Sequence, residues 1–398
     1  MPTIVIDIIT TAQGAKRLLE YRVSKINETK EYINYIICPE NPLFTNSFRQ
    51  NAIPYIPLRM YREIDLIHTI IEIKRFYDII KNIRPQIVHA HTSKAGAVAR
   101  VACCFYNLIH KDKIYICYQV HSFYFNALTG IKSFIFLKIE ILLAWISDII
   151  FFQNEIEKEQ AQKYRMDRNA ILENIGNGIN FQEFSYNFTI RTLPDWINYK
   201  PFTIICIARV EPKKNHTMLI ESINILRVLI EKKYGYEICK RAFKVYCVGE
   251  IGYSDPITLT KELNLEQWIQ FSGIKNRREI EDLLITGDLS VLTSYAEGKP
   301  RALMESMYAG LPCIATKVVG SSDVIDDRKT GFLVPLHDSE CFAKSIFKLM
   351  EDGDLYKSFS KASKEKAEIE FDENRVIECL KKIYTEKPKK YKKVNLFD

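Results

Sequence analysis

The chain has 398 residues, a formal net charge of +7, and 47% hydrophobic and 12% aromatic residues. This length exceeds what one ordinary hydrophobic core needs, so two domains of roughly 190 residues each are expected. The positive charge is spread over both halves of the chain, which argues against nucleic-acid binding and remains compatible with anionic ligands or an anionic membrane surface.

Apolar runs typical of strands alternate with helical spacing in the first half of the chain. They span residues 3–9, 32–38, 86–91, 113–121 and 148–153. The opening run, MPTIVIDIITT, has neither a basic start nor a long apolar core, so we expect a first strand and not a signal peptide. The alternation predicts a parallel sheet covered by helices on both faces.

The most hydrophobic stretch, residues 133–152, is interrupted by Lys138, Glu140 and Asp148. These charges argue against a membrane span. The stretch instead predicts a packed helix over residues 130–146, followed by the strand at 148–153.

A loop-like segment over residues 176–201 precedes a second series of strands and helices. Its strand-like runs lie at residues 202–208, 243–249, 289–294, 312–316 and 331–334. We therefore expect an α/β protein with two doubly wound, Rossmann-like domains, residues 1–185 and 186–372. A C-terminal helix within residues 373–398 is expected to cross back to the first domain and to end in a basic tail, KPKKYKK. Ligands bind at the carboxyl ends of the strands in such sheets, so we expect the two rows of strand ends to face one cleft.

The ten cysteines are scattered and form no C-x-x-C pair. Cys206, Cys247 and Cys313 lie in apolar strand-like runs, where a reduced thiol behaves as a small hydrophobic group. This usage predicts a reducing, cytoplasmic location.

The stretch SYAEGKPRALMESMYAGLP, residues 294–312, places one acid in a loop and a second in a helix. Gly298 and Pro300 keep Glu297 out of a helix interior, whereas residues 301–309, which include Glu305, are good helix formers. Pro300 is expected in the first turn of this helix. A helix N-terminus attracts phosphate or a sugar oxygen, and acids beside it accept hydroxyl protons, which suits a phosphorylated, polyhydroxylated ligand. The alternative is an acid that complements the helix dipole and a solvated Glu305.

The stretch IARVEPKKNH places Arg209 and Lys214 directly after the first strand of the second series. An anion would bind at this end of the strand, where a forked arginine and a mobile lysine could converge on one pyrophosphate. The alternative is a solvated basic turn.

The first domain carries weaker signals. Gly14 is expected in the first strand-to-helix turn, where it would let the backbone approach a ligand. The absence of a G-x-G-x-x-G motif argues against a nicotinamide enzyme.

Several histidines end predicted strands of the first domain. The stretch VHAHTSKAGAVAR ends a strand at His91, and Thr92 or Ser93 is expected to cap the next helix. We expect His89 and His91 to point to opposite faces of their strand, which argues against a shared metal ion. His121 ends another strand, where a structural and a functional role are both open.

Taken together, these motifs resemble glycosyltransferase family 4, and closely its capsular-polysaccharide branch. The similarity comprises HAHTSKAG, YQVHSF, IIFFQN, IGNGIN, IARVEPKKNH, TSYAEGKPRALMESMYAGLPCIAT and KTGFLVP, in order from about residue 85 to 370. The resemblance implies the two-domain GT-B fold, nucleotide-sugar donors, no metal or other cofactor, and retention of the donor's anomeric configuration.

The resemblance also implies roles for individual residues. Arg209 and Lys214 would bind the donor diphosphate, Glu297 the transferred sugar, and Glu305 the ribose diol. His121 would face the transferred sugar, and Gly14 would match the glycine of the first loop. Further donor contacts are expected from Gly298, Lys299 and Arg301, and acceptor-side contacts from Ser93 and Lys94.

This sequence departs from the family pattern at three places. Its first loop has one glycine where many members have two. Lys299 occupies a position that is usually apolar, and Asp323 stands where a glutamate is common.

The favoured hypothesis is a retaining glycosyltransferase of the hexosyl or N-acetylhexosaminyl type. It would move a sugar from a nucleotide sugar, expected to be a UDP-sugar, to a lipid-linked saccharide in the synthesis of capsule, exopolysaccharide or lipopolysaccharide. It would be cytoplasmic and attached peripherally to the inner face of the membrane. The alternatives are a nucleotide-sugar 2-epimerase and a catalytically silent subunit that binds a nucleotide sugar.

Overall fold

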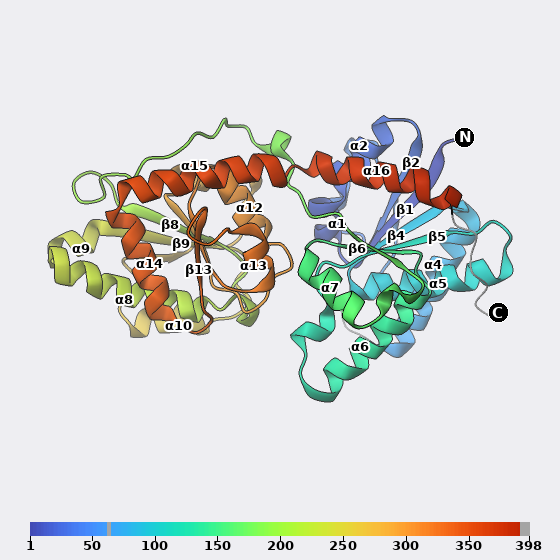
Figure 1. The fold of residues 1–398 in the computed structure, drawn as a ribbon, viewed down its shortest axis with the longest axis horizontal. Helices are drawn as coiled ribbons and strands as arrows, with labels where there is room; N and C mark the ends of the chain where they lie inside the picture. Colours follow the sequence, from blue (N-terminus) through green and yellow to red (C-terminus); the bar gives the residue numbers. More distant parts are fainter. Residues whose placement is uncertain (62–64, 391–398) are drawn as a thin grey trace. The chain divides into compact units, whose positions relative to one another are not determined.

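The computed structural model describes residues 1–61 and 65–390 and divides into two compact units (Figure 1). The first unit contains residues Met1–Asn177 together with the segment that begins at Glu373, and the second contains Gly178–Asp372. Of the predicted basic tail, positions 391–393 lie outside the described residues.

The first unit is built on a seven-stranded sheet in the order β3-β2-β1-β4-β5-β6-β7, with every neighbouring pair parallel. Its strands are β1 (Thr3–Ile9), β2 (Tyr32–Cys38), β3 (Tyr55–Pro57), β4 (Ile87–His91), β5 (Tyr115–Gln119), β6 (Ile149–Phe152) and β7 (Ile171–Asn174). Its helices are α1 (Ala12–Leu18), α2 (Glu20–Glu28), α3 (Pro42–Gln50), α4 (Leu66–Ile83), α5 (Ser93–Ile109), α6 (Gly130–Trp145), α7 (Glu155–Lys163) and α16 (Glu373–Lys390), with short 3₁₀ turns η1 (Tyr124–Ala127) and η2 (Met166–Arg168).

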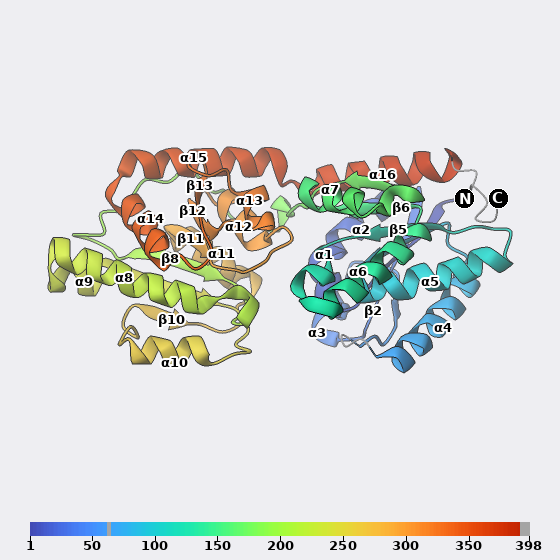
Figure 2. The same cartoon turned by 60° about the horizontal axis from the view of Figure 1, so that its bottom comes forward.

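Helices cover both faces of this sheet because successive strand residues point to opposite sides. One face packs against α4 and α5, through strand residues such as Val88 and Ala90. The other face packs against α16, through residues such as Val5 and Ile87. In Figure 2, α16 lies along the opposite side of the first unit from α4 and α5. Residues 373–390 therefore complete the core of a unit whose other elements come from the first part of the chain.

The second unit has a six-stranded parallel sheet in the order β10-β9-β8-β11-β12-β13. Its strands are β8 (Phe202–Ile207), β9 (Phe243–Val248), β10 (Ile269–Phe271), β11 (Leu289–Leu292), β12 (Cys313–Thr316) and β13 (Gly331–Val334). Its helices are α8 (His216–Tyr234), α9 (Tyr236–Ala242), α10 (Asp255–Glu262), α11 (Arg277–Thr286), α12 (Arg301–Tyr308), α13 (Val319–Val324), α14 (Ser339–Glu351) and α15 (Gly353–Glu370), with 3₁₀ turns η3 (Phe181–Glu183) and η4 (Pro212–Lys214).

The structure confirms the predicted fold class, since both sheets are parallel and doubly wound. Three strands that the sequence did not predict, β3, β7 and β10, each lie at the edge of a sheet. Two local predictions were wrong. Gly14 lies inside α1 and not in the turn before it, and Pro300 is the N-cap of α12 and not part of its first turn. Within the described ranges, every helix is too short or too polar to cross a bilayer.

Candidate active site

The second unit brings Lys214 and Glu297 into direct contact. Lys214 ends the turn η4, and the side chain of Asn215, in the left-handed region at φ 49°, then caps α8. Lys214 Nζ lies 2.6 Å from Glu297 Oε1. Arg209 follows β8 and is half exposed, with Nη2 3.2 Å from Glu211 Oε1. The two predicted diphosphate ligands thus lie after the same strand, and each is paired with a carboxylate.

The loop that carries Glu297 is held from two sides. Ser294 Oγ donates a hydrogen bond of 2.5 Å to Glu297 Oε1, so this oxygen has two donors. Behind the loop, a Cβ atom at Gly320 would lie 2.2 Å from the carbonyl oxygen of Gly298. Only glycine allows α13 to approach the loop this closely. Ser294 was not predicted as a site residue, although its position three residues before Glu297 is a usable signal.

Glu305 lies in α12, with Oε1 3.1 Å from Arg277 Nη1 and 4.0 Å from Arg301 Nη2. Arg277 opens α11 and stacks over the Phe184 ring at 4.1 Å. The sequence prediction missed Arg277 because it follows β10, which was itself missed.

The two residues of this unit that depart from the family pattern, Lys299 and Asp323, contact each other. Lys299 Nζ lies 2.9 Å from Asp323 Oδ2, which joins the Glu297 loop to α13. The Lys299 side chain is largely buried and also lies over the Phe371 ring at 5.3 Å. A lysine in place of an apolar residue is therefore matched by a nearby aspartate.

Of the candidate residues of the first unit, Lys94 is buried, whereas Gly14, Ser93 and His121 are partly exposed. A Cβ atom at Gly14 would meet Thr11 Oγ1 at 2.8 Å, so this glycine lets α1 pack tightly on its own cap. Ser93 begins α5, and Thr92 is its N-cap residue as predicted. Thr92 makes no side-chain capping hydrogen bond, and its Oγ1 instead pairs with Thr10 Oγ1 at 2.6 Å. Lys94 is buried, with Nζ 2.6 Å from Thr69 Oγ1 and 3.2 Å from Glu72 Oε2.

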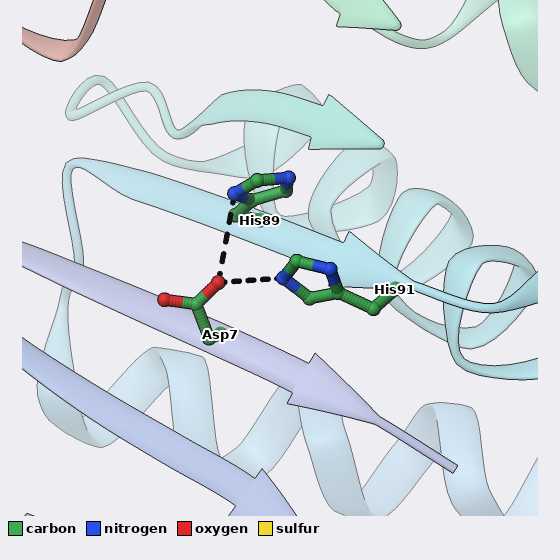
Figure 3. Close-up of side chains that lie close together, drawn as sticks. All are labelled: Asp7, His89 and His91. Atoms are coloured by element: carbon green, nitrogen blue, oxygen red, sulfur yellow. Dashed lines mark hydrogen bonds and ion pairs between the residues drawn. The ribbon is translucent and has the colours of Figure 1, made fainter. Parts of the chain in front are cut away.

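His89 and His91 point to the same face of β4, so the prediction of opposite faces was wrong. Residues two positions apart on a strand share a face, and the two rings lie 4.2 Å apart. Both approach Asp7 of the neighbouring strand β1 (Figure 3). Asp7 Oδ1 lies 2.7 Å from His91 Nε2 and 3.5 Å from His89 Nδ1.

His121 and Gln153 extend this cluster across two further strands. His121 Nε2 lies 3.4 Å from His91 Nδ1, and Gln153 Nε2 lies 2.6 Å from His121 Nδ1. Burial lowers the pKa of His121 to about 3 and holds the pKa values of His89 and His91 well below the usual value of 6.5. The three rings are therefore neutral at physiological pH.

Asp7, His89 and His91 are also the group in the described part of the chain whose ligand atoms could surround a metal ion. Their contacts fit a hydrogen-bond network better. Asp7 Oδ2 accepts from Asn34 Nδ2 at 2.7 Å, and His89 Nδ1 lies 2.7 Å from the Tyr384 hydroxyl. Burial raises the pKa of Asp7, and the charge of the buried Arg22 guanidinium acts in the opposite direction. The same positive charge would repel a cation at this site.

Comparison with known proteins is consistent with this geometry. The family description "Glycosyltransferase Family 4" matches residues 33–183, and "Glycosyl transferases group 1" matches residues 195–366. The chain belongs to glycosyltransferase family 4. This assignment favours the transferase hypothesis over the epimerase and the silent subunit.

Individual relatives of this family 4 glycosyltransferase are distant but extend over most of the chain. It is 24% identical to UDP-Gal:alpha-D-GlcNAc-diphosphoundecaprenol alpha-1,3-galactosyltransferase of Escherichia coli, over 80% of each chain. It is 23% identical to the capsular polysaccharide biosynthesis glycosyltransferase CapM of Staphylococcus aureus, over 84% of this chain and 85% of CapM. The structure of Anabaena HepE in complex with UDP and glucose aligns with a TM-score of 0.75 at 16% identity, over 96% of this chain and 99% of HepE. The GT-B fold is thereby shown.

Proposed function

We propose that this glycosyltransferase moves a sugar from a UDP-sugar to a lipid-linked saccharide, with retention of the anomeric configuration, in the synthesis of a surface polysaccharide. The observation that carries the proposal is the contact between Lys214 and Glu297 beside the N-terminus of α12. This contact places a cation that can bind a phosphate next to a carboxylate that can accept hydrogen bonds from sugar hydroxyls. Support also comes from relatives whose names include UDP-galactose, a diphosphoundecaprenol-linked sugar and capsule synthesis.

The proposed chemistry is stabilisation of a leaving diphosphate. As the bond to the anomeric carbon breaks, negative charge grows on the diphosphate and positive charge on the sugar. Lys214 has three N–H donors and uses one for Glu297, so it can also bind a phosphate oxygen. Arg209 and the backbone N–H groups of Gly298 to Arg301 would share this charge.

The two acids would bind different parts of the donor. Glu297, held by Lys214 and Ser294, would accept hydroxyl hydrogens of the transferred sugar. Glu305, held by Arg277, would accept from the ribose diol. His121 would contact the transferred sugar. With Arg209 and Lys214 neutralising the diphosphate, we expect transfer to persist when a chelator removes divalent metal.

Lys214→Ala tests this proposal, with Lys213→Ala as the matched control because Lys213 is the exposed neighbour in the same turn. We expect Lys214→Ala to lower turnover at least tenfold, about 1.4 kcal/mol of transition-state stabilisation. The assay follows labelled sugar from a panel of nucleotide sugars into membrane lipid extract. Equal activity of the two variants would refute the diphosphate role.

We further propose that the protein works at an anionic membrane surface through α6. Five large apolar side chains on this helix are exposed: Ile131, Phe134, Ile135, Ile139 and Leu142. They recur at intervals of three and four residues and so form one stripe. Lys132 and Lys138 are exposed on the same helix and would meet acidic headgroups. A lipid-linked acceptor would be held at such a surface.

A further inference from the structure

Four neighbouring strands of the first unit each contribute one polar side chain near or just after the carboxyl end. Asp7 comes from β1, His91 from β4, His121 follows β5 and Gln153 follows β6. These strands are adjacent in the sheet in this order. The side chains consequently form a row, with contacts of 2.7 Å, 3.4 Å and 2.6 Å from Asp7 to Gln153.

The direction of hydrogen bonding along this row is set by its buried end. Burial raises the pKa of Asp7, whereas the Asn34 hydrogen bond and the Arg22 charge favour its carboxylate form, which we assign here. A carboxylate only accepts, so His91 carries its hydrogen on Nε2 and donates it to Asp7 Oδ1. The Nδ1 atom of a neutral His91 is then an acceptor, and His121 must donate to it from Nε2. His121 Nδ1 in turn accepts from the amide nitrogen of Gln153.

The last histidine of the row differs from the others in its surroundings. His91, Gln153 and Asp7 are buried, whereas His121 is partly exposed. Its contact with His91 is also the longest of the three, at 3.4 Å. The His121 Nε2–H group is therefore only weakly satisfied within the protein and can be shared with an oxygen of a bound molecule.

We propose that Asp7, His91 and Gln153 are positioning residues that hold His121 as the Nε2–H tautomer, so that it presents a neutral N–H donor to an oxygen of the transferred sugar. This inference rests on the proposed function, since it assigns a sugar as the molecule that His121 contacts. It makes His121 a hydrogen-bond donor and not a general acid or base. His121 neither gains nor loses a proton during the reaction.

Asp7→Asn tests the proposal with almost no change in shape. Asn34 already donates to Asp7 Oδ2, so the new amide oxygen can accept there and its NH₂ group then faces His91. Each bond of the row would reverse, and His121 would become the Nδ1–H tautomer. Gln153→Glu tests the same idea from the other end, because a carboxylate would require a hydrogen on His121 Nδ1.

Two measurements are needed on the full-length protein: the ring nitrogen chemical shifts of His121 by ¹⁵N NMR, and kcat/KM for sugar transfer. We expect both variants to move the ring hydrogen from Nε2 to Nδ1 and to lower kcat/KM at least tenfold. Affinity for free UDP, a readout of the second unit, should change less than twofold. His89→Gln is the control, since His89 is buried in the same cluster but hydrogen-bonds to the Tyr384 hydroxyl at 2.7 Å and approaches the row only at Asp7 Oδ1, at 3.5 Å. It should leave the His121 tautomer unchanged.

The outcomes separate the possible failures. Lost activity with an unchanged tautomer would show a merely structural role, and a switched tautomer with full activity would show that the tautomer does not matter. Either result overturns the inference. If the unmodified protein transferred no sugar from any donor, the proposed function would fail. The NMR experiment would still test whether Asp7, His91 and Gln153 set the tautomer of His121. Thermal unfolding identifies a variant that does not fold, and the other variant then decides.

Discussion

At the scale of single residues, Lys299 and Asp323 show how two unusual side chains can depend on each other. Their 2.9 Å ion pair joins the Glu297 loop to α13, and the Lys299 side chain is mostly buried. Removing one partner would leave the other charge poorly solvated, which is commonly more costly than removing both.

We expect Lys299→Met and Asp323→Asn each to lower the melting temperature of the second unit and its affinity for UDP. The double variant should recover part of both losses, with a coupling of about 0.5–3 kcal/mol. A double-mutant cycle measured by thermal unfolding and UDP titration checks this. Strictly additive effects would show that the pair has no energetic role.

The buried histidines give the first unit a predicted pH dependence. Burial holds the pKa values of His89, His91 and His121 below 6.5, their value in an unfolded chain. Below pH 6.5 the unfolded state therefore binds more protons than the folded state, so stability is complete above this pH and is lost as the pH falls. Asp7, whose pKa burial raises, works in the opposite direction at lower pH.

We expect the opening free energy of β4, measured by amide hydrogen exchange, to fall between pH 7 and pH 5. Each histidine should contribute about 1 kcal/mol per pH unit below pH 6. His89→Gln should reduce this slope by the contribution of one histidine, about 1 kcal/mol per pH unit. A slope that is the same in the variant would contradict the assignment of a neutral, buried ring.

At the scale of elements, α6 is oriented differently from what its composition suggests. The sequence predicts a packed helix here, and the helix does form. Its buried residues, however, include Glu140, which pairs with the fully buried Arg100 at 3.0 Å, while five large apolar residues point outward. The direction of the apolar face could not be predicted because it depends on a partner forty residues away in the chain.

We expect the triple variant Ile131→Ser, Phe134→Ser and Leu142→Ser to lose most binding to anionic vesicles in a co-sedimentation assay. Each substitution removes an apolar side chain whose burial in the lipid interface contributes up to about 1.5–3 kcal/mol to binding. Val228→Ser, at an exposed apolar position of α8, is the control. If the variant bound normally and removal of residues 387–398 abolished binding, the basic tail would be the attachment site.

The sequence predicts most strands, and the three that it misses all lie at sheet edges, for a physical reason. Central parallel strands are buried on both faces and read as continuous apolar runs, such as residues 3–9 and 202–207. The missed strands are short, and β7 is only partly buried. Arg209, Lys214 and Glu297 could be singled out because they follow strands, and Glu305 because it lies in the helix that follows the Glu297 loop. Arg277, the partner of Glu305, and Asp7, the partner of His91, could not be found, because contact between distant segments is what gives them a role.

At the scale of the whole molecule, the chain leaves the first unit after Asn177 and re-enters it at Glu373. Five apolar residues of α16 belong to the core of the first unit: Val376, Ile377, Leu380, Ile383 and Tyr384. Glu373 also pairs with the buried Arg22 at 2.8 Å. At about 1.5–3 kcal/mol for each buried side chain, α16 contributes as much as the total stability of a typical domain.

We therefore expect a fragment of residues 178–372 to unfold cooperatively by itself and to keep its affinity for UDP. A fragment of residues 1–177 should lack a cooperative transition, and a synthetic peptide of residues 373–390 should restore one. Circular dichroism and calorimetry of the three samples check this. A cooperative transition in residues 1–177 alone would contradict it.

The return of α16 to the first unit also sets an order for folding during synthesis. The strands of the first unit leave the ribosome early, yet the helix that covers one face of their sheet follows only after the whole second unit. At a synthesis rate of about 5–20 residues per second, that apolar face of the sheet stays uncovered for on the order of ten to forty seconds. The second unit can finish folding in this interval, so the part of the protein made first is completed last and is the part that a chaperone would have to protect.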